Sequence, residues 1–258
     1  MVAKHSEFAE AYNRRGNTCR EACDYAGAVE NYMRAVALDP EYVEAYRNLG
    51  DACQLLGKFA EAVKCYTRAI KLNPGSADLY KDRASAHGSL EEHEREINDY
   101  SSAIDLDPDD ASAYGKRAAA LTLLGRHDEA IRDYSVLLQL KPHFGWVYAV
   151  RGDAYEGAGR HEEAIGDYAR FIELNPDQPE AYNGRGKAYS GMGNYAEAIK
   201  DFARAIELNP EFAEPYANRA RVFQRLGKRV EAIKDFKTAA RLGDEDARTI
   251  LDSGCIDW

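Results

Sequence analysis

Six prolines of this chain recur at one constant interval. Neighbouring members are always 34 residues apart, and the series comprises Pro40, Pro74, Pro108, Pro142, Pro176 and Pro210. An interval of this length is typical of proteins built from repeated supersecondary units, in which each unit buries its apolar face against its neighbours. The proline series therefore predicts a repeat array and argues against a fold around one central core.

Three further columns of residues follow the same interval. The first column is tyrosine throughout, and it comprises Tyr12, Tyr46, Tyr80, Tyr114, Tyr148, Tyr182 and Tyr216. The second is always aromatic, with Tyr32, Tyr66, Tyr100, Tyr134, Tyr168, Phe202 and Phe236. The third is alanine in every unit except one, where Glu96 stands, and its alanines are Ala28, Ala62, Ala130, Ala164, Ala198 and Ala232.

Local spacing predicts two helices in each unit. Tyr12, Gly16 and Cys19 are spaced i, i+4 and i+7, as are the residues that begin at Ala28, and each run describes one helical face. The second helix is expected to stop before each proline, which lacks an N–H group and disfavours helical geometry in its predecessor. Between the two runs, glycine suits a helix end with positive φ, and it occurs as Gly57, Gly125, Gly159, Gly193 and Gly227.

These residues together resemble the tetratricopeptide repeat (TPR): an aromatic residue, Gly or Ala four positions later, Ala and an aromatic residue four apart, and a closing proline. The resemblance implies an all-α fold, namely a right-handed α-solenoid of tandem helix-turn-helix units that forms a single domain over residues 1–258. The third unit departs from the pattern at Glu91 and Glu96, so we expect it to pack less tightly. The seven units are 9–42, 43–76, 77–110, 111–144, 145–178, 179–212 and 213–246.

The pattern changes after the last proline of the series, because Asp244 stands where the next proline is due. The segment from Asp244 to Leu251 is predicted to form a short helix, and residues 244–258 to form a C-terminal cap, since terminal repeats need a different outer face. Either the last residues, Cys255–Trp258, are a loose tail, or the cap covers the seventh unit with Ile250, Leu251, Ile256 and Trp258.

The Tyr12 column is expected to fill the space between closely approaching helices. On this interpretation Tyr182→Ala lowers the free energy of unfolding by about 3–5 kcal/mol, the range for truncation of a buried aromatic side chain.

An arginine column and an aspartate column occur together in units three to seven. Both are lost in unit two, where Leu49 and Cys65 stand, and this joint loss favours a structural ion pair within each unit over a ring of ligand-binding arginines. The arginines are Arg83, Arg117, Arg151, Arg185 and Arg219, and the aspartates are Asp99, Asp133, Asp167, Asp201 and Asp235.

Composition narrows the function further. The formal net charge of −10 disfavours binding to nucleic-acid backbones, which relies on clustered Lys and Arg. Five cysteines, an odd number, do not suggest a disulfide framework. No apolar run is long enough to span a bilayer, and the first ten residues contain no apolar signal core, so a cytoplasmic location is expected.

No pattern of catalytic residues is present in the sequence. His127 and His161 are 34 residues apart and share a column with aromatic residues, which indicates packing. Cys19 and Cys53 likewise share a core column and are expected to act as small apolar residues, not as metal ligands. We therefore predict a protein that is not an enzyme and that uses no cofactor or metal.

In TPR proteins, which this chain resembles, the first helices line a concave groove that binds peptides or partner helices. Trp146 stands out there, because its column otherwise holds acidic residues or serine, and an exposed aromatic residue often anchors an interface. The alternative is that Trp146 folds back against Phe144 or against an adjacent helix. The candidate partner-binding residues are Arg14, Asn17, Arg47, Asn48, Lys81, Lys116, Leu123, Trp146, Val150, Asn183, Lys187, Asn218 and Arg221.

The predicted function is a protein-interaction scaffold or adaptor that binds extended or helical segments of partner proteins. A specialised subset of the family grips the carboxylate tails of chaperones, but Asp78 and Asp82 put negative charge where that subset needs positive charge. Two alternatives stay open: a self-assembling structural protein, which light scattering tests, and an RNA-binding repeat protein, which the net charge disfavours.

Overall fold

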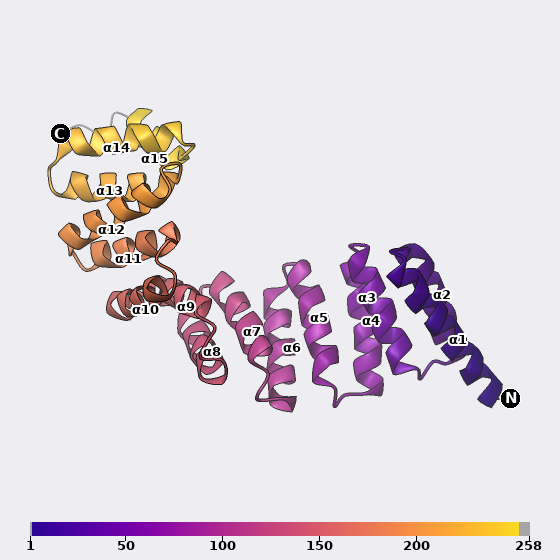
Figure 1. The fold of residues 1–258 in the computed structure, drawn as a ribbon. Helices are drawn as coiled ribbons and strands as arrows, with labels where there is room; N and C mark the ends of the chain where they lie inside the picture. Colours follow the sequence, from indigo (N-terminus) through magenta and orange to yellow (C-terminus); the bar gives the residue numbers. More distant parts are fainter. Residues whose placement is uncertain (1, 253–258) are drawn as a thin grey trace. The chain divides into compact units, whose positions relative to one another are not determined.

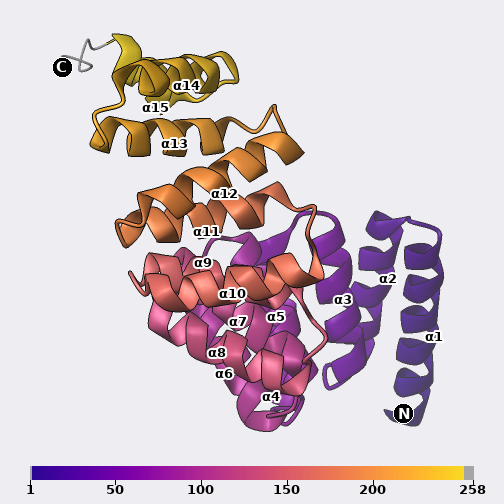
Figure 2. The same cartoon turned by 60° about the vertical axis from the view of Figure 1, so that its left-hand side comes forward.

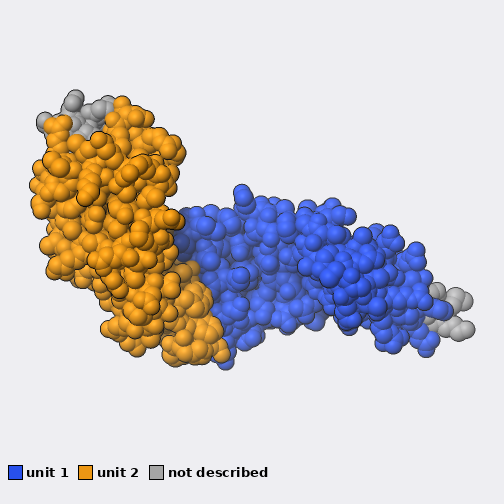
Figure 3. Space-filling model, turned by 45° about the horizontal axis from the view of Figure 1, so that its top comes forward, with its two compact units in different colours: residues 1–126 blue, residues 127–258 orange. Residues whose placement is uncertain are grey.

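The computed structural model describes residues 2–252, and within that range every regular element is an α-helix. The chain divides into two compact units, residues 1–126 (unit 1) and residues 127–258 (unit 2), which Figure 3 distinguishes by colour. The division falls between the two helices of the fourth repeat. The expectation of a single domain over residues 1–258 stays a prediction.

In each unit, successive helices pack side by side as hairpins, as Figures 1 and 2 show. The helices of unit 1 are α1 (Val2–Glu21), α2 (Tyr25–Leu38), α3 (Val43–Leu55), α4 (Phe59–Leu72), α5 (Ala77–Ser89), α6 (His93–Leu106) and α7 (Ala111–Leu123). Those of unit 2 are α8 (His127–Leu140), α9 (Trp146–Gly157), α10 (His161–Leu174), α11 (Pro179–Gly191), α12 (Tyr195–Leu208), α13 (Ala213–Arg225), α14 (Arg229–Arg241) and α15 (Glu245–Asp252). The predicted order of helix, tight turn, helix and short turn is confirmed.

The tight turn within each repeat requires the left-handed backbone conformation that the sequence predicts. Gly57 and Gly193, for example, have φ of 71° and 78°. In two repeats a residue with a side chain adopts the same conformation, with φ of 61° at Cys23 and 59° at Glu91. A Cβ atom makes this conformation unfavourable by roughly 1–2 kcal/mol, so these two turns carry local strain.

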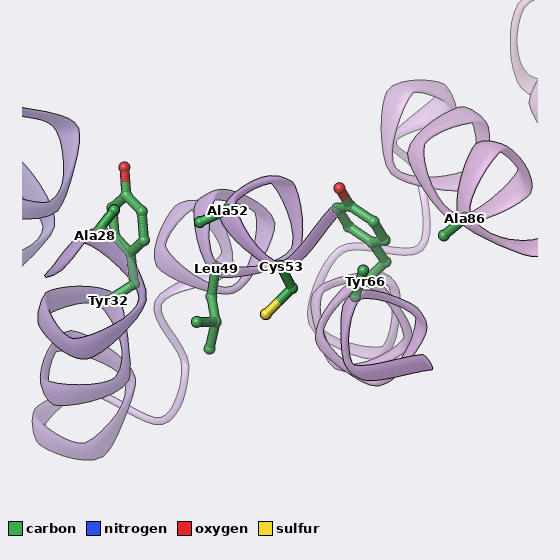
Figure 4. Close-up of a cluster of buried hydrophobic side chains, with 8 residues drawn as sticks. Ala28, Tyr32, Leu49, Ala52, Cys53, Tyr66 and Ala86 are labelled. Atoms are coloured by element: carbon green, nitrogen blue, oxygen red, sulfur yellow. The ribbon is translucent and has the colours of Figure 1, made fainter. Parts of the chain in front are cut away.

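The core consists of the alanine column and the aromatic column that begins at Tyr32. Ala28, Tyr32 and Tyr66 are fully buried, and Figure 4 shows Leu49 and Cys53 of α3 lying between the two tyrosine rings. The first helix must approach the second closely here, because a Cβ atom at Gly50 would lie 2.5 Å from Cε1 of Tyr66. The repeated pattern of small and aromatic residues is thus the pattern of the core.

The tyrosine column that begins at Tyr12 is not a core column, which corrects our expectation. Its members are half-buried at the border of the core, and an arginine lies over each ring. At Tyr182 the guanidinium carbon of Arg185 is 5.7 Å from the ring centroid, and the Tyr182 hydroxyl donates to the carbonyl of Pro176 at 3.1 Å. The helical spacing correctly predicted that this column contacts the second helices. It could not distinguish a column inside the core from one at the border of the core.

The irregular third repeat accommodates its glutamate through a second substitution. The Glu96 carboxylate accepts a hydrogen bond from His93 at 3.0 Å and is packed beneath Gly88, where a Cβ atom would lie 2.9 Å from its oxygens. Other repeats carry larger side chains at the position of Gly88, such as Gln54. The small residue at Gly88 therefore makes the room that Glu96 needs in place of alanine.

The predicted arginine–aspartate pairs form between the two helices of one repeat. In the pair Arg185–Asp201, Nε and Nη2 each donate to one carboxylate oxygen at 2.8 Å. The same two-bond geometry occurs at Arg83–Asp99, Arg151–Asp167 and Arg219–Asp235. The pair of Arg117 with Asp133 spans the two units and stays a prediction.

Some of these arginines also contact the preceding repeat, which the sequence reasoning missed. Nη1 of Arg83 donates to the Thr67 hydroxyl at 3.1 Å, and Nη1 of Arg151 donates to the Ser135 hydroxyl at 3.0 Å. Arg117 donates to the Ser101 hydroxyl at 2.9 Å. The guanidinium groups of Arg83 and Arg151 thus each join three helices.

The histidine and cysteine columns pack as expected. The His161 ring occupies the space beside Gly191, where a Cβ atom would lie 2.6 Å from its Cε1, and its Nδ1 pairs with Glu156 at 2.7 Å. His127 packs in the same way beside Gly157. Cys53 is buried in the core and Cys19 is partly buried against it.

The predicted C-terminal helix is present as α15. Ala247 is fully buried against the seventh repeat, and Ile250 and Leu251 pack partly buried beside it. Ile256 and Trp258, and with them the choice between a packed and a loose tail, lie outside the described residues. In residues 2–252 no helix combines the length and the apolar character that a membrane span requires.

Candidate functional site

The candidate site is the face of the first helices that points away from the core, called here the first-helix face. It carries residues 10, 13, 14 and 17 of α1 and their equivalents at intervals of 34. In unit 1 it lies on α1, α3, α5 and α7, and in unit 2 on α9, α11 and α13. Although the sequence predicted free polar side chains here, many of them bond to one another.

The first-helix face of unit 1 carries ion pairs, of which those of Arg47 connect neighbouring repeats and those of Lys81 lie within the third repeat. Nε of Arg47 lies 2.7 Å from the carboxylate of Asp82, and Nη1 lies 3.8 Å from Asp78. Nζ of Lys81 lies 2.6 Å from the carboxylate of Asp110 and 2.9 Å from Asp78. Arg47 and Lys81, both predicted to bind a partner, are therefore already engaged within the chain.

The electrostatics of this network differ between its carboxylates. Burial raises the pKa of the Asp82 carboxyl above its ordinary value, and the attraction of Arg47 only partly opposes this. For Asp110, burial also acts to raise the pKa, but the hydrogen bonds from Lys81 and from two backbone N–H groups outweigh it and hold the pKa low. The ionised form of Asp82 thus depends on Arg47 for its stabilisation.

Asparagine pairs, buried or partly buried, bridge the same repeat positions in unit 1 and in unit 2. Nδ2 of Asn48 donates to Oδ1 of Asn13 at 3.0 Å, and Nδ2 of Asn218 donates to Oδ1 of Asn183 at 3.1 Å. Asn48 and Asn183 expose only 8% and 4% of their surface, so they offer a partner almost nothing to contact. Their assignment as groove residues is corrected, because they link adjacent repeats.

These contacts share one sequence interval, 35 residues. It separates Asn13 from Asn48, Arg47 from Asp82, and Asn183 from Asn218. We call this series of inter-repeat contacts the 35-residue ladder. The interval arises because position 13 of one first helix faces position 14 of the next, one residue further along the repeat.

Core tyrosine hydroxyls also reach the first-helix face. The hydroxyl of Tyr32 donates to Oδ1 of Asn17 at 2.6 Å, and that of Tyr66 donates to Oδ1 of Asp51 at 2.7 Å. In unit 2 the hydroxyl of Tyr168 donates to Oδ1 of Asp153 at 2.6 Å. Asn17, another predicted partner-binding residue, is thereby tied to the core and only half-exposed.

The first-helix face of unit 2 contains an apolar stretch where the ladder is interrupted. Ala149 and Gly184 occupy the ladder positions between α9 and α11, and neither side chain can form a polar contact. Trp146 begins α9 and is 51% exposed, although its ring centroid lies 6.3 Å from that of Phe144. The contact with Phe144 leaves about half of the indole in solvent, so the two alternatives for Trp146 are combined.

The remaining candidates divide between exposed and paired side chains. Arg14 and Lys116 are exposed, and Leu123 at the end of α7 is 70% exposed. In unit 2, Val150 is half-buried, and Lys187 is exposed with its Nζ 3.6 Å from Glu214. Arg221 donates to Asn218 at 3.2 Å within α13. The structure thus leaves only part of the predicted set available to a partner.

Comparison with protein families assigns this architecture. Two models described as tetratricopeptide repeat match the chain, one at residues 43–76 and 179–212 and the other at residues 82–143. A third model, described as TPR repeat, matches residues 16–57 and 152–193. The chain belongs to the TPR family. The all-α array of helix-turn-helix repeats predicted from the sequence is thereby confirmed.

Solved TPR structures resemble this chain over most of its length. The crystal structure of MamA protein is 30% identical, covers 65% of this chain and 91% of its own, and has a TM-score of 0.62. A TPR protein from Parabacteroides merdae ATCC 43184 is 22% identical over 95% of this chain and 98% of its own, with a TM-score of 0.66. YrrB, described as a TPR protein with an unusual peptide-binding site, is 23% identical over 74% and 99%, with a TM-score of 0.59. A search of curated proteins returned no significant match.

Proposed function

We propose that this TPR protein is a non-enzymatic scaffold that binds an extended or helical segment of a partner protein through the first-helix face of unit 2. The partner segment supplies an apolar side chain that packs on the exposed part of Trp146. The observation that carries the proposal is the 51% exposure of this indole beside an interruption of the 35-residue ladder.

The surroundings of Trp146 support an anchoring role. Val150 lies one turn further along α9, and Ala149 beside it is a small, half-buried residue, whereas Gly184 of α11 is buried against the ring of Tyr168. Exposed aromatic side chains with apolar neighbours often anchor protein interfaces. Lys187 and Glu214 lie on the same face and provide polar contacts around the apolar centre.

The polar network of unit 1 supports the choice of unit 2. A partner that displaced Arg47 from Asp82 would leave a partly buried carboxylate without its counter-ion, which is costly. The TPR fold can present a peptide site, as the description of YrrB states for that protein. Free thiols at Cys19, Cys23, Cys53 and Cys65 agree with the reducing cytoplasm that we propose as the location.

A peptide-display selection tests this function. Random dodecapeptides are selected on the full chain and then titrated against the chain carrying Trp146→Glu, which installs the acidic residue found at this position in other repeats. We expect the selected peptides to share an apolar residue and to lose at least about 30-fold in affinity, the loss typical of an interface hot spot.

The matched control is Phe8→Glu, since Phe8 is an aromatic residue of α1 that is 60% exposed. This change should leave the affinity within about twofold. Peptides that bind the Trp146→Glu chain as tightly as the original chain would refute the proposed anchor.

A further inference from the structure

A second surface with a different chemistry lies at the C-terminal end of unit 2. A shallow hollow of about 760 Å³ opens between α14 and α15. Four basic side chains line it, namely Lys234, Lys237, Arg241 and Arg248, together with the apolar Ala240 and Leu251. This concentration of cations is unexpected in a chain whose formal net charge is −10.

The positive charge is local to the last repeat and the helix that follows it. Residues 213–252 contain nine Lys and Arg against seven Asp and Glu, whereas the whole chain has 34 against 44. The other 218 residues therefore hold 25 against 37, so the two parts have opposite formal charge. A partner attracted to the hollow is repelled by most of the remaining surface.

Three of the four cations lack a counter-ion. Within residues 2–252, no carboxylate forms an ion pair with Lys234, Lys237 or Arg241, whereas Arg248 pairs with Glu245 at 2.6 Å. Nη2 of Arg241 donates to the Thr238 hydroxyl at 3.2 Å, which holds its side chain against α14. The basic rim of the hollow is thus available to an anionic group from outside.

Equivalent positions in earlier repeats do not combine these features. Lys200 occupies the position of Lys234 one repeat earlier, and its Nζ pairs with Glu197 at 2.7 Å. Thr67 occupies the position of Lys237 in the second repeat, and its hydroxyl accepts a bond from Arg83 of the next repeat. The hollow is therefore a feature of the end of the array and not of every repeat.

The spacing of the cations indicates an extended ligand. Lys234, Lys237 and Arg241 follow one face of α14 at i, i+3 and i+7, so the outer two are separated by about 10 Å along the helix axis. A compact phosphate needs donors that converge on one point, whereas a chain of carboxylates can meet cations along a line. The apolar floor, Ala240 and Leu251, suits an apolar side chain between those carboxylates.

We propose that the hollow between α14 and α15 binds an acidic peptide segment that carries apolar side chains among its carboxylates. This site is separate from the Trp146 surface and goes beyond the function proposed above. It gives the chain two binding surfaces with opposite requirements, one for an apolar anchor and one for negative charge.

Fluorescence anisotropy with a labelled dodecapeptide, four repeats of Glu-Glu-Leu, tests the proposal on the full chain. Replacing both Lys234→Gln and Arg241→Gln should weaken binding about tenfold, as expected for two partly exposed ion pairs. A peptide of four Glu-Glu-Ser repeats should also bind more weakly, because it has no side chain for the apolar floor.

The matched control is Lys64→Gln with Lys71→Gln, which removes two exposed cations from the same repeat positions on α4. This variant should keep the affinity within about twofold. A charge-reversed variant, Lys234→Glu with Lys237→Glu and Arg241→Glu, should instead bind a Lys-Lys-Leu peptide. Far-ultraviolet circular dichroism verifies that each variant is folded.

Three outcomes would overturn the proposal. One is equal weakening by the α14 and α4 double variants, which would show that only net charge matters. Another is tighter binding of inorganic triphosphate than of the peptide, which would indicate a compact anion site. The third is failure of the peptide to bind while the chain self-associates through the same cations.

Discussion

The first-helix faces of the two units are built on the same repeat but are filled differently. In unit 1 the face carries Arg47–Asp82 and Lys81–Asp110 contacts, so its charges are largely neutralised within the chain. In unit 2 the corresponding surface near the start of α9 carries Trp146 and small residues. The repeat position of Asp78, which pairs with Arg47 and Lys81 in unit 1, is thus occupied in unit 2 by the exposed Trp146.

The difference shows why polar residues on such a face are an unreliable sign of a binding site. A side chain that bonds to the next repeat has a structural reason to be there, and its charge is partly screened from a partner. The residues that stand out for binding are those that the 35-residue ladder does not use. Trp146 in unit 2 meets this condition, and Arg47 in unit 1 does not.

The largest expected effect concerns the core, which should be alike in the two units. Tyr66→Ala in unit 1 and Phe202→Ala in unit 2 remove fully buried rings and should each lower the free energy of unfolding by about 3–5 kcal/mol. Tyr182→Ala, from the half-buried column, should cost less than about 2 kcal/mol. Urea denaturation followed by circular dichroism measures all three.

Phe8→Ala, at an exposed aromatic residue, serves as the control and should change stability by no more than about 0.5 kcal/mol. A loss for Tyr182→Ala equal to that for Phe202→Ala would mean that the two aromatic columns are equally buried and would contradict the structure.

An intermediate effect should separate the two faces. Arg47→Met leaves Asp82 without its partner and should cost about 1–3 kcal/mol at pH 7, whereas Asn183→Ala in unit 2 removes one neutral hydrogen bond and should cost about 1 kcal/mol. The pKa of Asp82 is already raised by burial, and losing Arg47 raises it further.

Protonation removes the penalty of an isolated carboxylate, so the sign of the pH effect is fixed. The deficit of the Arg47→Met chain should be largest at neutral pH and should shrink as the pH falls through the raised pKa of Asp82. The deficit of the Asn183→Ala chain should not shrink in this way. Denaturation at pH 7 and at mildly acidic pH distinguishes the two, and a constant deficit for Arg47→Met would show that the ion pair is unimportant.

The smallest expected effect lies in a turn. Glu91→Gly relieves the strain of a positive φ and should raise the free energy of unfolding by about 0.5–1 kcal/mol, after the greater flexibility of glycine in the unfolded chain is taken into account. Gly193→Ala, at a turn with φ of 78°, should lower it by a similar amount. Thermal denaturation compares the two, and a destabilising Glu91→Gly would show that this side chain has another role.

Much of the fold could be predicted from the sequence, because the interval of 34 residues repeats the same local physics seven times. Glycine at the turn, alanine in the core and the Arg185–Asp201 type of pair each appear several times in register. In the second repeat, Leu49 and Cys65 replace the arginine and the aspartate together, and this joint replacement predicted that the two residues pair within one repeat. Pairs such as Arg185–Asp201 confirm this prediction.

The site was predicted less well, because its contacts connect different repeats. Asn48 and Asn183 were read as surface residues, since comparison at intervals of 34 hides a partner that lies 35 residues away. Complementary pairs at that second interval, such as Arg47 with Asp82, were the available signal. A hydroxyl residue 16 positions before an arginine, such as Thr67 before Arg83, was a similar signal for the hydrogen bond that this arginine donates to the preceding repeat.

The exposure of Trp146 could not be derived from its neighbours in sequence. Helical spacing puts it on the outer side of α9, but the contact with Phe144 depends on the path of the loop before the helix. The basic hollow was missed for a different reason. Three of its four cations come from α14, but their meeting with Arg248 around one hollow depends on how α15 packs against α14.

The 35-residue ladder has a consequence for protein engineering. Because Arg47 and Asp82 belong to different repeats, a segment excised at the proline boundaries carries away one half of an ion pair and strands the other. Shuffled or duplicated arrays should therefore be cut so that both partners of a junction travel together. In this chain the unit to transfer is therefore the interface between two adjacent hairpins, with both of its partner residues.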